Sequence, residues 1–328
     1  MKMRKAYLDE YLGLLDMGLA SCLFAAMAGC VFLVSQGPNP LEAPVVSFIR
    51  VGVNLGLVTF PALFSGRFRA LFGDLRPSLW LRGLFGGTSL MLSFLSIQRI
   101  GPGESAFLTA TSGIFVAAMG PWVLGQKNRW SDWLAILGAF AGLYLLMAPE
   151  EAHGDLVGRS MGLGSGFLAA LAYLMVSRSG RSNHPVTIVF YFSLIGFLIH
   201  GIWFGVVGLK LPVDQRAWLL ALGAGLLGTI AQFFLTRAYQ RAPAAKVSAM
   251  GFLSPVLSLW LSISFFAVQP SSRALGGCVL ILLAGVLLPF VRVLSSLKTD
   301  PSKGGAWASK RKKTAERRNP KWRRSGRH

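Results

Sequence analysis

Charged residues are scarce in this chain. Only 14% of its 328 residues are Asp, Glu, Lys or Arg, whereas soluble domains usually carry about a quarter. Hydrophobic residues make up 53% of the chain, and the mean hydropathy is +0.54. There is too little polar surface to cover a globule in water, so the composition excludes an ordinary soluble domain.

Motifs for catalysis and metal binding are also missing. The three cysteines, Cys22, Cys30 and Cys278, have no spacing that suggests a metal site or a disulfide. The sequence contains no HExxH motif, no GxxxxGK[ST] motif and no nucleophile–base pair. We therefore expect no enzyme activity, no metal and no cofactor.

Long apolar runs occur along most of the chain. Each run is about 18 to 22 residues long, which is enough to cross a hydrocarbon core. A continuous helix satisfies its own backbone hydrogen bonds in lipid, so the sequence predicts an all-α integral membrane protein. Ten transmembrane helices are expected at 15–35, 44–65, 79–98, 105–124, 131–148, 160–177, 185–207, 217–236, 247–268 and 273–294.

Glycines recur every four residues inside several of these runs. Gly158, Gly162 and Gly166 form one such series, and Gly138 and Gly142 form another. Small residues on one helix face allow backbones to approach closely in lipid-embedded bundles. These series predict close helix–helix contacts.

Basic residues predict the orientation, because Lys and Arg are retained on the cytoplasmic side of a membrane. They concentrate at helix ends that share a side with the N-terminus, among them Lys5, Arg67, Lys127 and Arg241. The connection after the fifth helix is acidic and is expected outside. We therefore predict a multi-pass protein of the bacterial inner membrane with both termini cytoplasmic.

Two terminal segments flank the predicted bundle. Residues 1–14 are expected to form a cytoplasmic N-terminus. Residues 295–328 are expected to form a basic, disordered cytoplasmic tail, which contributes a large share of the net charge of +20 and is too polar to bury a core. The tail is interpreted as an anchor on anionic lipid headgroups. A contact with nucleic acid and a partner-binding motif remain alternatives, and nucleic acid is not expected as a partner.

The two halves of the chain resemble each other. Residues 17–28 read MGLASCLFAAMA and residues 161–172 read MGLGSGFLAALA, which share seven of twelve residues. Other pairs follow in the same order, such as Pro44-Val45 with Pro185-Val186. Similar composition could produce one such pair by chance, but hardly several in order.

Each half of this repeat holds five helices. Five is an odd number, so the second half must enter the membrane from the opposite side. We therefore expect two inverted five-helix repeats, 15–148 and 160–294, an arrangement typical of secondary transporters with a substrate site near the midplane.

Several motifs carry a family resemblance over roughly residues 15–294. They are Leu-Arg-Gly at Leu81–Gly83, Leu-Ser-Pro-Val at Leu253–Val256, Arg50, and glycines in the last helix of each half. With these motifs in order, the chain resembles the EamA-like family of the drug/metabolite transporter superfamily.

The resemblance implies a secondary transporter. Such a protein could be an exporter, uniporter or exchanger of small polar metabolites, for example amino acids or compounds like S-adenosylmethionine, and it would not hydrolyse ATP. The sequence departs from the family pattern at Gln126 and Gln269, where the family usually has Glu.

Arg50 is the outstanding charge inside a predicted helix. Ser47, Arg50 and Asn54 recur at helical spacing and form one polar stripe. An Arg at the centre of a span costs about 2.5–3.5 kcal/mol on insertion scales, so it needs a reason to be there. Arg50 and Asn54 are candidates to bind an anionic group of a substrate. A structural Arg that bonds to nearby carbonyls is an equal alternative.

Further polar residues are expected to line the path of the substrate. Pro255 removes a backbone hydrogen bond in mid-helix, and such breaks usually line a polar cavity. We expect hinges at Gly113 and Pro255, where the fourth helix of each half would rock. The lining candidates are Ser93, Thr109, Ser112, Tyr173, Gln232 and Ser254.

No acid lies near a predicted midplane. Proton-coupled transporters commonly place Asp, Glu or His there, so facilitated diffusion or exchange fits better. His200, within 185–207, is interpreted as a hydrogen-bonded core residue.

The sequence is compatible with three functions. The first is a carrier whose partners are a small-molecule metabolite and membrane lipids, present as a monomer or homodimer. The second is a lipid or lipid-carrier flippase on the same fold. The third is a non-transporting membrane scaffold that recruits partners through its tail.

Overall fold

The computed structural model describes residues 2–35, 37, 41–147, 155–209, 211, 214–266 and 269–287. The predicted basic tail lies outside these residues. All regular structure in the described residues is helical. The elements are α1 (Lys2–Ser35), α2 (Ala43–Phe64), η1 (Phe68–Phe72), α3 (Pro77–Ala110), α4 (Ser112–Leu124), α5 (Trp130–Met147), α6 (Leu156–Ser179), α7 (Pro185–Val207), α8 (Gln215–Arg241), α9 (Ala244–Gly251), α10 (Leu253–Phe266), α11 (Ser272–Ile281) and the π-helical η2 (Leu282–Leu287).

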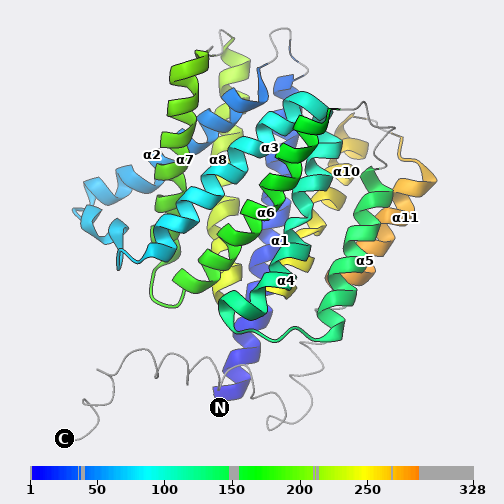
Figure 1. Ribbon diagram of the computed structural model, residues 1–328. Coiled ribbons are helices and arrows are strands. Elements are labelled where there is room, and N and C mark those ends of the chain that lie inside the picture. The colour runs from blue at the N-terminus through cyan, green and yellow to red at the C-terminus, as the bar shows by residue number, and fades with distance from the viewer. Residues whose placement is uncertain are drawn as a thin grey trace, which may run out of the picture.

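The described chain is a bundle of ten membrane helices. Eight helical stretches are long and apolar enough to cross a membrane. The first part of α3 and the continuous stretch of α11 and η2 complete the ten. The prediction of an all-α membrane protein is confirmed, and α1 runs through the middle of the bundle (Figure 1).

Several helix boundaries differ from the prediction. Helix α1 begins at Lys2 instead of residue 15, so most of the predicted N-terminal segment 1–14 is helical. Within α3, Gly101 is non-helical, with φ 80° and ψ 165°, and separates two helical parts, which agrees with the predicted end of one helix at residue 98 and start of the next at residue 105. The predicted fourth and ninth helices are each divided in two, as described below.

The two five-helix halves pack on each other reciprocally. The first helix of each half packs against the third helix of the other, as α1 with α8 and α6 with α3. The second helices α2 and α7 pair, and so do the fifth helices α5 and α11, which lie together at one edge of the bundle (Figure 1). Such reciprocal pairing is the contact pattern of a two-fold axis, here between two halves of one chain.

The first-with-third pairs run antiparallel. Gly13 near the start of α1 faces Ala242 just after α8, while Met27 further along α1 faces Gly228 in the middle of α8. Ser89 of α3 likewise faces Ser165, and its oxygen donates to the Ser165 carbonyl at 2.9 Å. With five helices in each half, this direction confirms the inverted repeat.

Glycines bring several of these helices together. A Cβ atom added at Gly166 would lie 2.8 Å from the carbonyl oxygen of Leu108, so α6 approaches the end of α3 too closely for any side chain there. Gly142 of α5 and Gly277 of α11 meet in the same way, each within 3 Å of the other's carbonyl oxygen on the same test. The predicted close contacts are present at both places.

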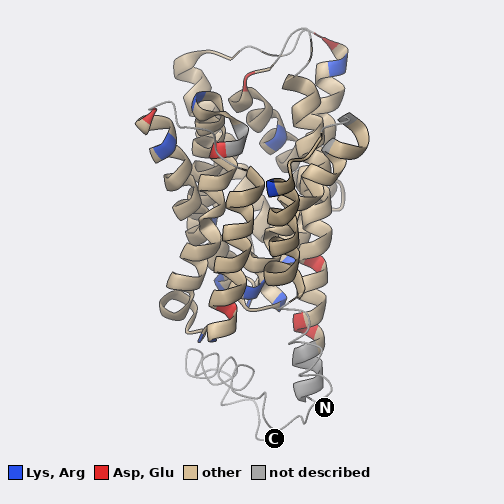
Figure 2. Ribbon diagram, turned by 90° about the vertical axis from the view of Figure 1, so that its right-hand side faces the viewer, with Lys and Arg blue, Asp and Glu red and all other residues tan. Residues whose placement is uncertain are grey.

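The outside of the bundle is apolar along its length. Phe64, Trp122 and Val206 are 90%, 86% and 84% exposed, which suits side chains that face lipid. Charged residues gather toward the two ends, and few lie along the middle (Figure 2). The exposed surface is that of a membrane protein.

Candidate functional site

The fourth helix of each half is broken at an equivalent place. In the first half the helix breaks at Thr111, between α3 and α4, and in the second half at Phe252, between α9 and α10. Each break is a tight turn: the Thr111 N–H donates to the Leu108 carbonyl at 3.2 Å, and the Phe252 N–H to the Ala249 carbonyl at 3.3 Å. The two breaks meet, because a Cβ atom at Gly113 would lie 3.1 Å from the Phe252 ring.

Pro255 explains the second break. A proline cannot donate a hydrogen bond to the carbonyl four residues earlier, so the helix is weakest in the turn before it. The chain turns at Phe252, within that stretch. The first half has no proline at this position, and there the Thr111 hydroxyl bonds the Leu108 carbonyl at 2.6 Å instead.

A cavity of about 160 Å³ lies at the meeting point of the two breaks. Its size is close to that of an engineered cavity of about 150 Å³ that holds one benzene. Its wall is formed by residues of both halves, from α1, α3, α4, α6, α8, α9 and α10. The polar side chains in the wall are those of Ser112, Tyr173, Tyr239, Ser248 and Ser254.

Two stacked tyrosines form one side of the cavity. The rings of Tyr173 and Tyr239 lie 4.9 Å apart at 14°. The Tyr239 hydroxyl is 2.9 Å from that of Ser248, so this phenol already has a partner. The aromatic faces and the hydroxyl groups of the two tyrosines make this wall an amphipathic surface.

Arg50 is buried inside the bundle on α2, with 8% of its surface exposed. Its guanidinium carbon is 5.8 Å from the centre of the Phe24 ring, and Phe24 lines the cavity. Gly228 of α8 provides the room, because a Cβ atom there would lie 2.9 Å from Arg50 Nε. Among the described residues Arg50 has no carboxylate partner.

Asn54 lies one helical turn after Arg50. It is buried, and its Oδ1 has no hydrogen-bond partner in the described part of the chain. An unsatisfied buried acceptor is costly, and a ligand donor would relieve that cost. The third member of the predicted polar stripe, Ser47, bonds instead to His200, oxygen to Nε2, at 2.8 Å.

His200 is a core residue, as predicted. It is fully buried, and its Nδ1 lies 2.8 Å from the Gly196 carbonyl oxygen, so both ring nitrogens have partners.

Arg82, the arginine of the Leu-Arg-Gly motif at Leu81–Gly83, is a second buried arginine. Only 2% of its surface is exposed, and its guanidinium carbon lies 4.5 Å from the centre of the Phe192 ring on α7. Its Nε has no hydrogen-bond partner among the described residues. A Cβ atom at Gly86 would collide with its Nη1, which shows why a glycine stands one turn later.

The predicted site residues fall into three groups. Ser112, Tyr173 and Ser254 line the cavity, together with both predicted hinge residues, Gly113 and Pro255. Arg50, Asn54 and Gln232 are buried on α2 and α8 and do not line it. Ser93 and Thr109 also lie outside the wall, and their hydroxyl oxygens are 3.5 Å apart. Their roles toward a substrate stay predictions.

Ion pairs join the two halves at the end of the bundle where α1 begins. Asp16 accepts from Arg241 at 2.8 Å and lies 3.5 Å from Arg237, which ties α1 to α8. Glu10 pairs with Lys246 of α9. Both of these buried acids lie in the first half of α1 and are paired with basic residues of the second half of the chain.

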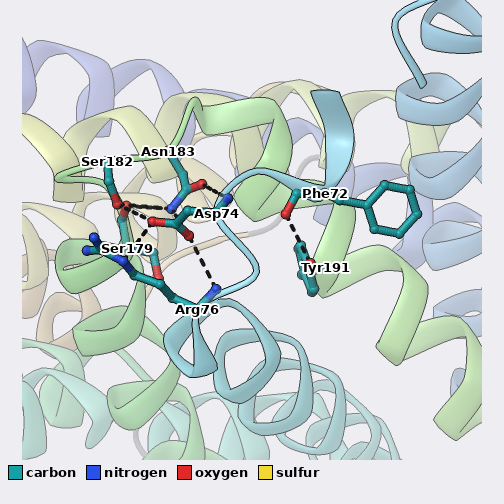
Figure 3. Close-up of polar contacts among 7 residues, drawn as sticks. All are labelled: Phe72, Asp74, Arg76, Ser179, Ser182, Asn183 and Tyr191. Carbon is teal, nitrogen blue, oxygen red and sulfur yellow. Dashed lines mark hydrogen bonds and ion pairs between the residues drawn. The ribbon is translucent and has the colours of Figure 1, made fainter. Parts of the chain in front are cut away.

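Asp74 makes another connection between the halves (Figure 3). Its carboxylate accepts from the Ser182 hydroxyl at 2.7 Å and from Asn183 Nδ2 at 2.9 Å, while Arg76 Nε lies 2.9 Å away. Burial alone would raise the pKa of Asp74, but these hydrogen bonds and the neighbouring arginine hold it below its ordinary value. Nearby, the Tyr191 hydroxyl donates to the Phe72 carbonyl at 3.1 Å.

The opposite end is joined by exposed pairs. Asp155 caps α6 by accepting from the Gly158 N–H at 2.9 Å, and it pairs with Arg99 at 3.1 Å. These two contacts lower the pKa of Asp155. Glu104 pairs with Arg159 at 2.7 Å. Both ends of the bundle are thus held by polar contacts between halves, with the cavity between them.

Gln126 occupies one of the two positions where the EamA-like pattern usually has Glu. Its Oε1 accepts from the backbone N–H of Ala244, the first residue of α9, at 3.1 Å. A neutral amide oxygen therefore caps the broken helix of the other half, so this position does not need a carboxylate for that contact.

Sequence comparison decides the family. Residues 15–148 and 156–290 each match the EamA-like transporter family, once in each half. The chain belongs to this family. EamA-like proteins are transporters and not enzymes, so the prediction of a membrane transporter is confirmed.

Individual relatives agree with the family assignment. The chain is 26% identical over 281 residues to the pseudopaline exporter CntI of Pseudomonas aeruginosa, a match that covers 84% of this chain and 97% of that protein. It is 28% identical over 179 residues to the riboflavin transporter of Vibrio cholerae, covering 53% and 58% of the two chains. A solved crystal structure with 16% identity matches 86% of the chain and 98% of its own length, at a TM-score of 0.73, which shows that the two proteins share a fold.

Proposed function

We propose that this EamA-like protein is a secondary carrier that moves small polar metabolites across a bacterial inner membrane by alternating access. Both termini face the cytoplasm in this proposal. The substrate binds in the cavity between the halves, and the carrier works as an exporter, uniporter or exchanger. The relatives support the substrate class in broad terms, since one is named as an exporter of pseudopaline and another as a transporter of riboflavin.

The meeting of the two helix breaks is the observation that carries the proposal. A broken helix leaves backbone groups free and can bend at the break, which is how many carriers form a site and move around it. Here both breaks border one cavity, which is lined by Gly113 just after the first break and by Pro255 just after the second. Rocking of α4 against α9 and α10 would open the cavity alternately to the two sides.

Arg50 is proposed to attract an anionic group of the substrate. A buried guanidinium without a carboxylate partner binds a carboxylate or phosphate strongly, because both charges are shielded from water. Phe24 links Arg50 to the cavity, and Asn54 Oδ1 offers an acceptor for a donor on the same substrate. Among the described residues no acid lines the cavity, and the buried Asp16 and Glu10 are already paired with basic side chains, so we propose coupling by exchange or facilitated diffusion.

The test is transport by purified protein in proteoliposomes loaded with a panel of labelled polar metabolites. Arg50→Ala should reduce flux of the transported compound by about 10- to 150-fold, since a buried charged contact is worth about 1.5–3 kcal/mol and the cavity loses its anchor. Arg69→Ala is the matched control, because Arg69 is exposed in η1 and its loss should leave flux unchanged.

Two results would contradict the proposal. Full flux in Arg50→Ala would remove the anchor role. Movement of labelled lipid, with no flux of any water-soluble compound in the panel, would favour the flippase instead. Insertion of each variant is checked by its yield in the membrane fraction.

A further inference from the structure

An ion pair stands next to the cavity wall, on the side where the chain begins. Met17 lines the cavity, and Asp16 is the residue before it on α1. Tyr239 also lines the cavity, and Arg241 follows it two residues later at the end of α8. An Asp16 carboxylate oxygen and Arg241 Nη1 are 2.8 Å apart. The first polar layer beyond the cavity in this direction is therefore a contact between the two halves.

Three more residues complete this layer. Arg237, one turn before Arg241 on α8, has its Nε 3.5 Å from the same oxygen of Asp16. Glu10 of α1 pairs with Lys246 of α9. The Asp16 and Glu10 side chains are only 7% and 9% exposed. These five residues are called the gate, and each of its ion pairs joins one half of the chain to the other.

Helices α1 and α8 also approach each other closely at the gate. Gly13 lies one turn before Asp16, and a Cβ atom there would lie 2.9 Å from the Ala242 Cβ and 3.1 Å from the Ala242 backbone nitrogen. Ala242 directly follows α8 and is buried. A backbone atom cannot turn aside as a side chain can, so no side chain fits between the helices. The gate is therefore closed by packing as well as by charge.

The internal repeat shows what stands at the opposite end. The series MGLAS, which begins at Met17, matches MGLGS, which begins at Met161. The residue before each series is Asp16 in the first half and Ser160 in the second. Ser160 is neutral and exposed. The second half thus has no acid where the first half has the buried acid of the gate.

The arginine of the gate does have an equivalent. Gln98-Arg99 matches Gln240-Arg241 in the repeat, and Arg99 pairs with Asp155. These two side chains are 49% and 29% exposed. An exposed ion pair contributes little, whereas removing one partner of a buried pair is costly. The two ends of the bundle are therefore closed unequally, and the N-terminal end is closed more firmly.

We propose that the gate holds the cavity closed on the side of the N-terminus, so that the carrier without substrate favours the state open to the opposite side. The inference rests on the proposed carrier function and adds the device that sets its resting state. Each ion pair of the gate joins the two halves, so opening toward the N-terminus requires the pairs to separate. The difference in the cost of opening the two ends then sets the populations of the two states.

Labelling of a cavity cysteine from each side tests the gate. The full-length protein, with Cys22, Cys30 and Cys278 replaced, is studied in sealed vesicles of both orientations. Ser254→Cys lies in the cavity wall, and Arg69→Cys in the exposed part of η1 shows which vesicles present the N-terminal side. A membrane-impermeant thiol reagent should label Ser254→Cys about 10-fold faster from the opposite side than from the N-terminal side. Equal rates, or faster labelling from the N-terminal side, would overturn the inference.

Variants of the gate are then compared in the Ser254→Cys protein. Asp16→Asn should raise the rate of labelling from the N-terminal side about 10-fold, while the rate from the opposite side changes less than about twofold. Asp155→Asn is the matched control, because it removes the acid of the exposed pair at the other end, and it should leave the rate from the N-terminal side unchanged. An unchanged rate in Asp16→Asn would overturn the inference, as would an equal rise in Asp155→Asn.

A second variant covers the case in which Asp16→Asn does not insert into the membrane. Gly13→Ala forces α1 away from Ala242 without changing a charge, and it should raise the same rate from the N-terminal side. No rise in Gly13→Ala would then overturn the inference.

A general loosening of the bundle gives a different result from an open gate. Ser193, on α7, is fully buried, so Ser193→Cys should stay unlabelled when combined with Asp16→Asn. Labelling of Ser193→Cys in that protein would show loosening and would overturn the inference.

Failure of the gate and failure of the carrier proposal are also distinguishable. If the gate variants leave the labelling rates unchanged while the wild type transports a metabolite, the carrier remains and the gate is wrong. If Ser254→Cys is labelled from neither side and no compound of the metabolite panel is transported, the carrier proposal itself fails.

Discussion

Gly166 is the residue whose replacement most sharply tests how the two halves fit together. It packs α6 against the turn at the first helix break. A Cβ atom at this position would collide with Thr111 Oγ1 and would lie 2.8 Å from the Leu108 carbonyl oxygen. The carbonyl is backbone, so it cannot move aside without shifting the break itself. We therefore predict that Gly166→Ala lowers both stability and transport.

The expected loss of stability follows from a comparison with a glycine whose surroundings leave room for a side chain. No atom lies within 4 Å of a Cβ added at Gly201 on α7. Replacing Gly by Ala inside a helix stabilises by about 0.5–1 kcal/mol, and this gain is common to both variants. Overpacking costs about 1–3 kcal/mol and applies only at Gly166. The free energy of unfolding of Gly166→Ala should thus fall about 1–3 kcal/mol below that of Gly201→Ala.

Unfolding by sodium dodecyl sulfate in mixed micelles, followed by circular dichroism, measures this difference. Flux in proteoliposomes, with both variants at equal protein content, measures the effect on the break. Equal stability of the two variants would refute the close contact of α6 with the first break. Normal flux in a destabilised Gly166→Ala would show that the shape of the break does not matter for transport.

Two further predictions concern the polar contacts between the halves. Asp16→Asn should lower the free energy of unfolding by about 1–3 kcal/mol, because the Asp16 side chain is buried while its partners Arg237 and Arg241 are about one-third exposed. Chemical unfolding in micelles measures this difference. Unchanged stability would contradict the ion-pair contact. Asp74 has a lowered pKa, so its contribution is present above about pH 4 and is lost as pH falls through that lowered pKa. The difference in melting temperature between wild type and Asp74→Asn should shrink on acidification. A difference that grows would contradict a lowered pKa of Asp74.

The architecture was predictable because a chain that crosses a membrane can adopt few kinds of backbone structure. Long apolar runs must be helices, and an odd number of helices per repeat forces inversion. Pro255 marked the second break, since proline removes a specific hydrogen bond. The matching break at Thr111 carries no such marker, and only the repeat pointed to it.

Helix ends and side-chain depth were harder to predict. Residues 2–14 were not recognised as helix, because their polar residues interrupt the apolar run. In the structure Glu10, in this segment, and Asp16, just after it, are buried against basic residues of α9 and α8. Arg82 resembled an end-of-helix cation in sequence, five residues after α3 begins. Gly86, one turn later, was the available signal, because the missing side chain leaves room for the Arg82 guanidinium. That role can be recognised only when the helix packed against α3 is known.

The cavity shared by both halves is the central claim, and site-directed labelling tests it most directly. In a variant with Cys22, Cys30 and Cys278 replaced, Ser254→Cys is treated with a membrane-impermeant thiol reagent, and Ser193→Cys, which is fully buried, serves as the control. The account predicts that Ser254→Cys is labelled, that a transported metabolite protects it, and that Ser193→Cys stays unlabelled. Failure to label Ser254→Cys from either side of the membrane would contradict a water-accessible path between the halves.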